Sequence, residues 1–303
     1  MRIITIPIFE NNYSYLIVDD KTNEAAAVDP AEPQKVLTAL AQTGARLTSV
    51  LTTNHHQHHS VGNIDLIKEK PNLAIFGHDA RIPELNYVCK HEEEFTVGTL
   101  KVRSLHTPSY TKGSVCYYVR DFNEMNDEIE RVLFTGDTLL TGGCGKFIEG
   151  DAKDMHNVLY NILGTLPKDT KVYCGHEYGM SNLQFANTID PNNQNIRRKL
   201  AWLQAADRTV PSTIGDELEC NPYLRISELP IQNATGTLDP YESIQMLRAL
   251  NDNFNIQNNG INNLNGSLGI NNCVNEFSNG MNVDRMNGVN VMNIMNGLSN
   301  LVM

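Results

Sequence analysis

Hydrophobic and polar positions along the first 180 residues follow two patterns, one typical of strands and one typical of helices. Short apolar runs bounded by polar turns predict strands. Nine such runs follow one another along the chain: Arg2–Phe9, Tyr13–Val18, Ala25–Val28, Leu47–Leu51, Leu73–Phe76, Phe95–Leu105, Val115–Val119, Val132–Phe134 and Lys171–Cys174. Helical spacing predicts helices over Pro33–Ala41, which Gly44 is placed to end, and over Lys153–Leu163.

Strands that alternate with crossover helices predict a two-sheet core with helices outside it. After Ser181 the strand signal fades, and Arg197–Ala206 and Tyr241–Leu250 have helical periodicity. We therefore expect an α/β domain over residues 1–180 and a smaller helical domain over 181–254.

The composition changes sharply near residue 255. Sixteen of the 49 residues from Asn255 to Met303 are Asn, and only Glu276, Asp284 and Arg285 are charged. Because Asn disfavours both helix and strand and the apolar residues there have no period, we predict a disordered Asn-rich tail over residues 255–303.

Composition and charge exclude several classes of protein. The chain has 303 residues and a formal net charge of −11, which disfavours binding to nucleic acid or to an anionic membrane. The six cysteines include no CxxC pair, so we expect reduced thiols. No secretory signal and no apolar run long enough to span a membrane is visible. These features predict a cytoplasmic protein.

Side chains that commonly bind metals follow three of the predicted strands. Four histidines come directly after the strand that ends at Leu51: His55, His56, His58 and His59. Asp137 and His176 follow two later strands, each behind a glycine. Each feature also has a plainer explanation: the histidines can be an exposed tract, Asp137 can cap a turn or helix, and His176 can be a loop histidine. Together, three strand ends with zinc-type ligands favour a single metal-binding rim.

Seven motifs occur in order along the chain: NNYSYLIVDD, AAAVDPAEP, LTTNHHQHH, FTGDTL, GCGKFIEG, VYCGHEY and NPYLR. Together they resemble glyoxalase II, the hydroxyacylglutathione hydrolase family of the metallo-β-lactamase superfamily, from about Met1 to Phe254. The resemblance implies an αββα sandwich followed by a helical substrate-binding domain. It also implies hydrolysis of S-D-lactoylglutathione to glutathione and D-lactate, in the detoxification of methylglyoxal.

The resemblance also shows where this chain departs from the family. The family holds two metals with a THxHxDH motif, a later His, the Asp of FTGD and the His of CGHE. Here Asn54 replaces the first His, His58 replaces the Asp, and Tyr110 replaces the later His. Only His56 and the bridging Asp137 remain for the first metal, and two ligands are too few for a stable site. We predict that the first metal is absent.

The second metal site keeps more of its ligands. The resemblance implies the set His58, His59, Asp137 and His176, all of types that tetrahedral zinc accepts. Imidazole is longer than the carboxylate that it replaces at position 58, so His58 can overshoot the metal. We predict one zinc ion per chain, with iron or manganese as alternatives, and a metal-bound water in place of a side-chain nucleophile.

The substrate-binding residues are also partly kept. Lys146, Tyr178 and Arg248 match family positions that contact glutathione, whereas Ile148 replaces a family tyrosine. The expected partner is a glutathione thioester bound by a monomer. Two hypotheses follow: a one-metal thioester hydrolase with reduced activity, or an inactive paralogue that binds glutathione thioesters or another partner. A nuclease of the same fold is disfavoured by the acidic charge and the helical segment.

Overall fold

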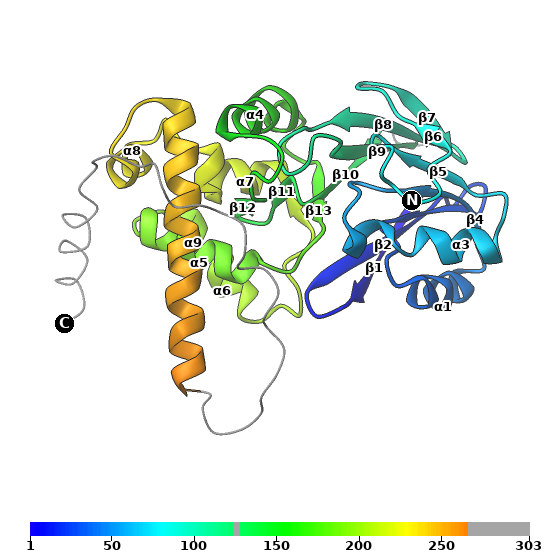
Figure 1. Ribbon diagram of the computed structural model, residues 1–303, viewed down its shortest axis with the longest axis horizontal. Coiled ribbons are helices and arrows are strands. Elements are labelled where there is room, and N and C mark those ends of the chain that lie inside the picture. The colour runs from blue at the N-terminus through cyan, green and yellow to red at the C-terminus, as the bar shows by residue number, and fades with distance from the viewer. Residues whose placement is uncertain (124–127, 266–303) are drawn as a thin grey trace. The chain divides into compact units, whose positions relative to one another are not determined.

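Two six-stranded sheets lie at the centre of the protein, as Figure 1 shows for the computed structural model, which describes residues 1–123 and 128–265. The first sheet contains, in order, β1 (Arg2–Ile8), β2 (Asn12–Val18), β3 (Glu24–Val28), β4 (Arg46–Leu51), β5 (Ala74–Gly77) and β6 (Tyr87–Val88). β1, β2 and β3 pair antiparallel, and β3 to β6 pair in parallel. Parallel neighbours bring the carboxyl ends of β3 and β4 to one edge of the sheet.

The second sheet is mostly antiparallel. Its order is β14 (Ser212–Thr213), β13 (Lys171–Cys174), β10 (Glu128–Gly136), β9 (Val115–Asn123), β8 (Leu100–His106) and β7 (Glu94–Val97). Only β10 and β13 are parallel neighbours, so both of these strands also end at the same edge. A small hairpin of β11 (Leu139–Leu140) and β12 (Gly143–Cys144) follows β10.

Helices cover the outer faces of the two sheets. The helices among the described residues are α1 (Pro33–Thr43), α2 (Gln57–Ser60), α3 (Asn63–Glu69), α4 (Ala152–His156), α5 (Gly179–Ile189), α6 (Gln194–Leu203), α7 (Ile214–Cys220), α8 (Leu229–Thr235) and α9 (Pro240–Asn265). A π-helical stretch, Asn157–Ile162, and two 3₁₀ turns, Leu163–Thr165 and Pro222–Leu224, complete the helical segments among the described residues. None of the helices within 1–123 and 128–265 is both long and apolar enough to cross a membrane.

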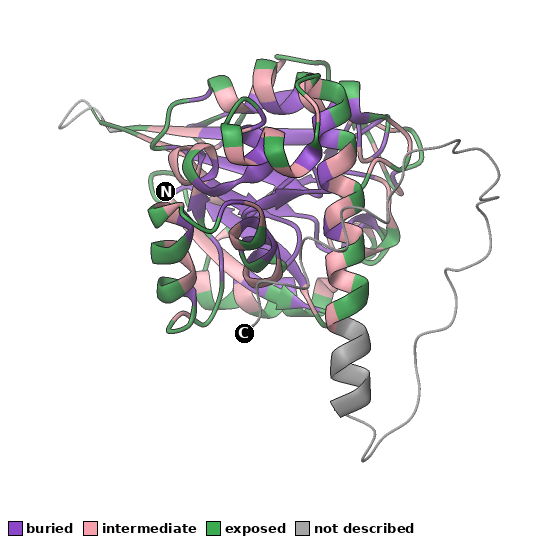
Figure 2. Ribbon diagram, turned by 90° about the vertical axis from the view of Figure 1, so that its left-hand side faces the viewer, coloured by how far each residue is buried: buried purple, intermediate pink, exposed green. Residues whose placement is uncertain are grey.

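The alternation of side chains along the strands produces three apolar layers. In β2, Tyr15 faces the second sheet, where its ring lies 5.3 Å from that of Phe134. Its neighbour Leu16 faces the other way and packs with Val36 of α1. On the outer face of the second sheet, buried residues of α9 pack in the same cluster as Leu133. Figure 2 shows these buried strands in the interior, with helices exposing their outer faces. The predicted αββα sandwich is confirmed.

Several element boundaries differ from the expectation. The single run Phe95–Leu105 is two strands, because Gly98 turns the chain with a φ of +58°. The helix predicted over Lys153–Leu163 changes from α4 into the π-helical stretch. Among the other helices, α5 was not predicted, although its residue Phe185 is buried.

The last helix continues beyond the predicted start of the Asn-rich tail. α9 runs to Asn265, and where the tail was predicted to begin, Phe254 packs against Phe185 and the Asn255 side chain accepts a hydrogen bond from Ser181. Tertiary contacts here outweigh the low helix propensity of Asn. The rest of the predicted tail, 266–303, lies outside the described residues. Both predicted domains fall within one compact unit, Met1–Asn258, so the boundary near residue 180 stays a prediction.

The cysteines fit the expectation of reduced thiols. The five that the structure describes are all buried and none forms a disulfide: Cys89, Cys116, Cys144, Cys174 and Cys220. Cys273 lies outside the described residues.

A buried carboxylate joins the helical segment to the β11–β12 turn. Glu217 of α7 accepts hydrogen bonds from the Gly142 N–H at 2.8 Å, the Asn221 side chain at 2.9 Å and the Ser212 hydroxyl at 2.5 Å. Burial raises the pKa of Glu217, so a neutral side chain is tolerated there.

We predict that Glu217→Ala lowers the free energy of unfolding by about 3–5 kcal/mol, because buried donors lose their acceptors. Glu217→Gln keeps an acceptor for Gly142 and Asn221 and can donate to Ser212, so its effect should stay within about 1 kcal/mol. Urea denaturation of both variants checks this. Equal losses for Ala and Gln would show that the hydrogen bonds of Glu217 do not matter for stability.

Candidate metal centre

The candidate ligands come together because their strands end at one edge of the sandwich. Asp137 follows β10, His176 follows β13, and the histidine loop follows β4. Residue 175 must be glycine for this close approach, since a Cβ atom there would lie 2.8 Å from Cε1 of His59. The sequence prediction that separate strand ends meet therefore agrees with the geometry.

Three histidines form the core of the candidate site. Ligand nitrogens of His58, His59 and His176 all lie within 4.8 Å of one another, and this group does not include Asp137. The Asp137 carboxylate instead lies against two of them, 2.8 Å from His59 Nε2 and 2.6 Å from His176 Nδ1. Both nitrogens are buried, and apart from Asp137 neither has a hydrogen-bond partner in this arrangement. Buried nitrogens of this kind, next to a carboxylate, fit a bound cation.

The protonation states of two of these histidines differ. Burial and the neighbouring His59 lower the pKa of His58 to about 4, so that His58 is neutral near pH 7. Burial opposes a charge on His59, but Asp137 and Asp29 raise its pKa to about 10. Burial likewise opposes a charge on Asp137, yet His59 and His176 hold its pKa well below the usual range. Because a ligand nitrogen must be deprotonated, metal uptake at this site should release a proton.

Two further residues orient the histidines and were not singled out from the sequence. Asp29 Oδ2 lies 2.8 Å from His59 Nδ1 and also accepts a 2.7 Å hydrogen bond from the Thr53 hydroxyl. Asn12 Nδ2 lies 2.9 Å from His176 Nε2. Carboxylate and amide partners of this type fix the orientation of a ligand ring. Asp29 could have been found from its position in the sequence, because it directly follows β3 and so lies at the same sheet edge.

The three positions that depart from the family differ in what they do. The Asn54 amide donates to Asp137 at 3.1 Å, and Tyr110 Oη lies 3.0 Å from His56 Nδ1. Burial raises the pKa of Tyr110, which keeps its hydroxyl neutral and a poor metal ligand. His58, by contrast, takes part in the three-nitrogen group. Asn54 and Tyr110 thus form hydrogen bonds at the two positions that correspond to ligands of the first metal in the family.

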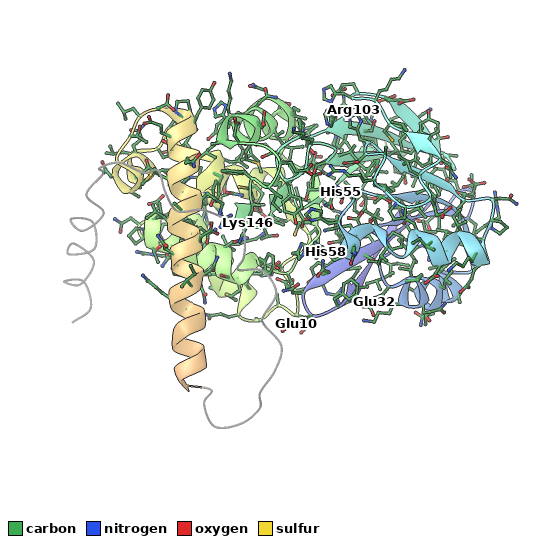
Figure 3. All side chains as sticks on the ribbon, viewed as in Figure 1. Glu10, Glu32, His55, His58, Arg103 and Lys146 are labelled. Carbon is green, nitrogen blue, oxygen red and sulfur yellow. The ribbon has the colours of Figure 1, made fainter. Side chains whose placement is uncertain are left out.

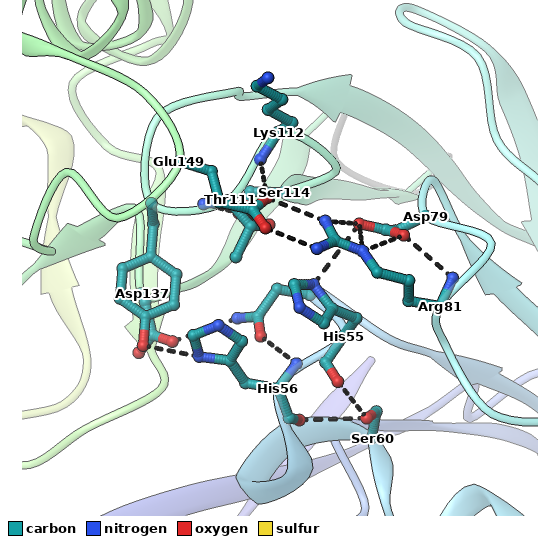
Figure 4. Close-up of polar contacts among 12 residues, drawn as sticks. His55, His56, Ser60, Asp79, Arg81, Thr111, Lys112, Ser114, Asp137 and Glu149 are labelled. Carbon is teal, nitrogen blue, oxygen red and sulfur yellow. Dashed lines mark hydrogen bonds and ion pairs between the residues drawn. The ribbon is translucent and has the colours of Figure 1, made fainter. Parts of the chain in front are cut away.

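A second group of possible ligands lies beside the first. His55, Asp79 and Glu149 offer ligand atoms within 4.8 Å of one another. However, the Arg81 guanidinium lies between the two carboxylates, 2.6 Å from Asp79 and 2.5 Å from Glu149 (Figure 4). The Arg81 guanidinium already balances the charge of the two carboxylates, so this group is a poor metal site. Its ion pairs instead connect the surrounding loops.

The predicted glutathione contacts lie in different surroundings. Tyr178 stacks on the His176 ring, with centroids 5.0 Å apart, and lines a cleft of about 570 Å³ together with His58 and His176. Lys146 is exposed and lies outside this lining. Arg248 is largely buried, donating to the Cys144 carbonyl at 3.2 Å and pairing with Asp252 at 3.0 Å. The geometry therefore brings only Tyr178 next to the histidines.

Comparison with known proteins decides the family. The hydroxyacylglutathione hydrolase-like protein of Gallus gallus is 41% identical over 258 residues, covering 84% of this chain and 90% of that protein. The cytoplasmic hydroxyacylglutathione hydrolase of Arabidopsis thaliana is 40% identical, covering 84% and 99%. The chain belongs to the hydroxyacylglutathione hydrolase family. The model of the C-terminus of this family matches residues 177–254.

Solved structures agree on the fold of this hydroxyacylglutathione hydrolase family member. ETHE1 from Myxococcus xanthus has a TM-score of 0.59 at 25% identity and covers 83% of this chain and 92% of its own. A metallo-β-lactamase from Staphylococcus aureus has a TM-score of 0.58 at 21% identity, covering 82% and 70%. These neighbours show that the chain has the metallo-β-lactamase fold.

Proposed function

We propose that the protein hydrolyses S-D-lactoylglutathione and related glutathione thioesters, using one zinc ion. The observation that carries this proposal is that ligand nitrogens of His58, His59 and His176 lie within 4.8 Å of one another, beside the Asp137 carboxylate, in a chain of the hydroxyacylglutathione hydrolase family. In the reaction a water oxygen bonds to the thioester carbon and the carbon–sulfur bond breaks. The products are glutathione, whose sulfur takes up a proton, and D-lactate.

His58, His59, His176 and Asp137 would hold the metal, with iron or manganese as alternatives to zinc. When bound, such a metal lowers the pKa of water to about 7 and polarises a carbonyl group. Asp29 and Asn12 keep the rings of His59 and His176 in place. A site with fewer anionic ligands than the family pattern has less help in orienting the attacking water, so we expect reduced turnover.

For substrate binding we propose Lys146, Tyr178 and Arg248 as glutathione contacts. Tyr178 is already beside the histidines, and exposed Lys146 is free to meet a carboxylate. Arg248 would have to exchange its contact with Asp252 for the substrate. A helical substrate-binding domain over 181–254 is supported by the family model over 177–254. A cytoplasmic monomer remains our proposal, supported for location by the name of the Arabidopsis relative.

A second candidate is an inactive paralogue that binds glutathione thioesters or another partner. The hydrogen bonds of Asn54 to Asp137 and of Tyr110 to His56 favour it, because they replace ligands of the first metal.

Metal content and thioester hydrolysis, measured on the same purified protein, separate the two candidates. We predict at most one tightly bound metal per chain, because two ligands of the first metal are replaced by Asn54 and Tyr110. We also expect slow loss of the thioester absorbance of S-D-lactoylglutathione that depends on this metal. Two tightly bound metals would contradict the proposed site, and a metal-loaded protein with no turnover would favour the paralogue.

A further inference from the structure

The cleft beside the histidines has a wall that the proposed reaction has not yet used. Besides His58, His176 and Tyr178, the cleft of about 570 Å³ is lined by Phe9 and Val61. Its remaining lining consists of the neutral side chains Asn11, Asn12 and Gln57. A space of this size next to the reaction centre is large enough for a ligand group of several carbon atoms.

Apolar side chains are exposed to solvent in this cleft. Phe9 is 50% exposed, and Val61 and Tyr178 are each 40% exposed. They come from three separate places in the chain: the turn between β1 and β2, the residue after α2, and the loop after β13. Apolar surface gathered from distant segments at one cleft is typical of a binding site.

Phe9 is held in place at an energetic cost. Its φ of +48° lies in the left-handed region, which is strained for a residue other than glycine. Its N–H donates to the Glu32 carboxylate at 2.6 Å, which stabilises this conformation. Strain retained at the edge of a site points to a function for the side chain that it positions.

The charges around the cleft define what it can bind. The lining contains no Lys, Arg, Asp or Glu side chain. The residues next in sequence to Phe9 and His176 are acidic, Glu10 and Glu177, and Glu177 is engaged by the Tyr13 hydroxyl. At the wall formed by Phe9 and Val61 a neutral apolar group is therefore favoured over a carboxylate, because this wall offers no cationic side chain. The only cation proposed for the cleft is the metal at His58 and His176.

We infer that this cleft is the acyl subsite and that the enzyme prefers glutathione thioesters whose acyl group is neutral, apolar and several carbons long. The inference rests on the proposed function, because the thioester carbon must lie at the histidines. Of the three proposed glutathione contacts, Lys146 and Arg248 lie outside the cleft lining. Tyr178 lies in it beside His176, where the acyl group and glutathione would meet. Figure 3 shows Lys146 and Glu10 in different directions from His58. Glutathione would occupy the Lys146 side and the acyl chain the Phe9 side.

Binding of S-alkylglutathiones tests the subsite without requiring hydrolysis. Calorimetry on the metal-loaded full chain compares S-methylglutathione, S-butylglutathione and S-(3-carboxypropyl)glutathione. We expect the butyl compound to bind about tenfold tighter than the methyl compound. This gain in affinity is smaller than full burial of three methylene groups would give, because the side chains that line the cleft stay partly exposed. The carboxypropyl compound should lose this gain.

A matched pair of variants assigns the effect to the cleft. Phe9→Ala should reduce the butyl-to-methyl ratio to about threefold, because it removes a large part of the apolar wall. Phe122→Ala is the control, since Phe122 is similarly exposed, at 47%, but lies on β9 outside the cleft lining. The control should keep the full ratio.

The outcomes are separable from those of the proposed function. Chain-length-dependent binding that Phe9→Ala reduces supports the subsite, even if no thioester is hydrolysed. Equal binding of the methyl and butyl compounds, or tighter binding of the carboxypropyl compound, overturns it even if S-D-lactoylglutathione is hydrolysed. Equal ratios in the Phe9→Ala and Phe122→Ala variants, or no binding of any of the three, also overturn it.

Discussion

The combined substitution Asn54→His, His58→Asp and Tyr110→His should raise kcat/KM for S-D-lactoylglutathione by about 10³-fold, since a second Lewis acid is worth several kcal/mol. The physical reason lies in two hydrogen bonds. At present the Asn54 amide donates to Asp137 and the Tyr110 hydroxyl contacts His56, so neither position offers an imidazole nitrogen. The substitutions replace both groups with metal ligands and return a carboxylate to position 58.

Metal analysis gives this prediction a second readout. The variant should bind two metals per chain, one more than the unmodified protein. A control with two of the same types of substitution outside the site, His91→Asp with Tyr87→His, should change neither metal content nor rate, because both side chains are exposed and neither belongs to a candidate ligand group. A folded variant with two metals and unchanged kcat/KM would show that ligand loss does not limit the rate.

His176→Ala should abolish tight metal binding. The group of three ligand nitrogens would fall to two, and two imidazoles with one carboxylate that already pairs with His59 are a weak site. We expect the affinity for zinc to fall by more than about 100-fold. Loss of a residue that only orients a metal ligand lowers affinity by up to about 100-fold, and loss of a ligand itself should cost more. Competition with a coloured chelator measures the affinity directly.

Removal of a different histidine provides the control for this variant. His91 is exposed and belongs to neither candidate ligand group, so His91→Ala should retain the metal. Unchanged zinc affinity in His176→Ala would remove His176 from the site. The same fall in both variants would mean that the metal is held by surface histidines in general.

Much of the sandwich could be predicted from periodicity, because its strands obey the local rule of alternation. The run Tyr13–Val18 places Tyr15 and Leu16 on opposite faces, as the two clusters require. α5 was not predicted, since its contacts are made with distant segments such as Phe254 of α9. The end of α9 was misplaced for the same reason, because composition does not report the contact of Asn255 with Ser181.

The sequence by itself determined the family, the fold and the identity of the candidate ligands, because motifs and strand ends are local properties of the chain. Only the tertiary structure decided how those ligands combine. It grouped His58 with His59 and His176, placed Asp137 against only two of the three, and added Asp29 as a partner of His59. Some of these contacts join residues that are more than a hundred positions apart in the sequence. The distances between their side chains depend on how the two sheets pack against each other. The same packing brought Phe9 and Tyr178 to one cleft, which no local pattern describes.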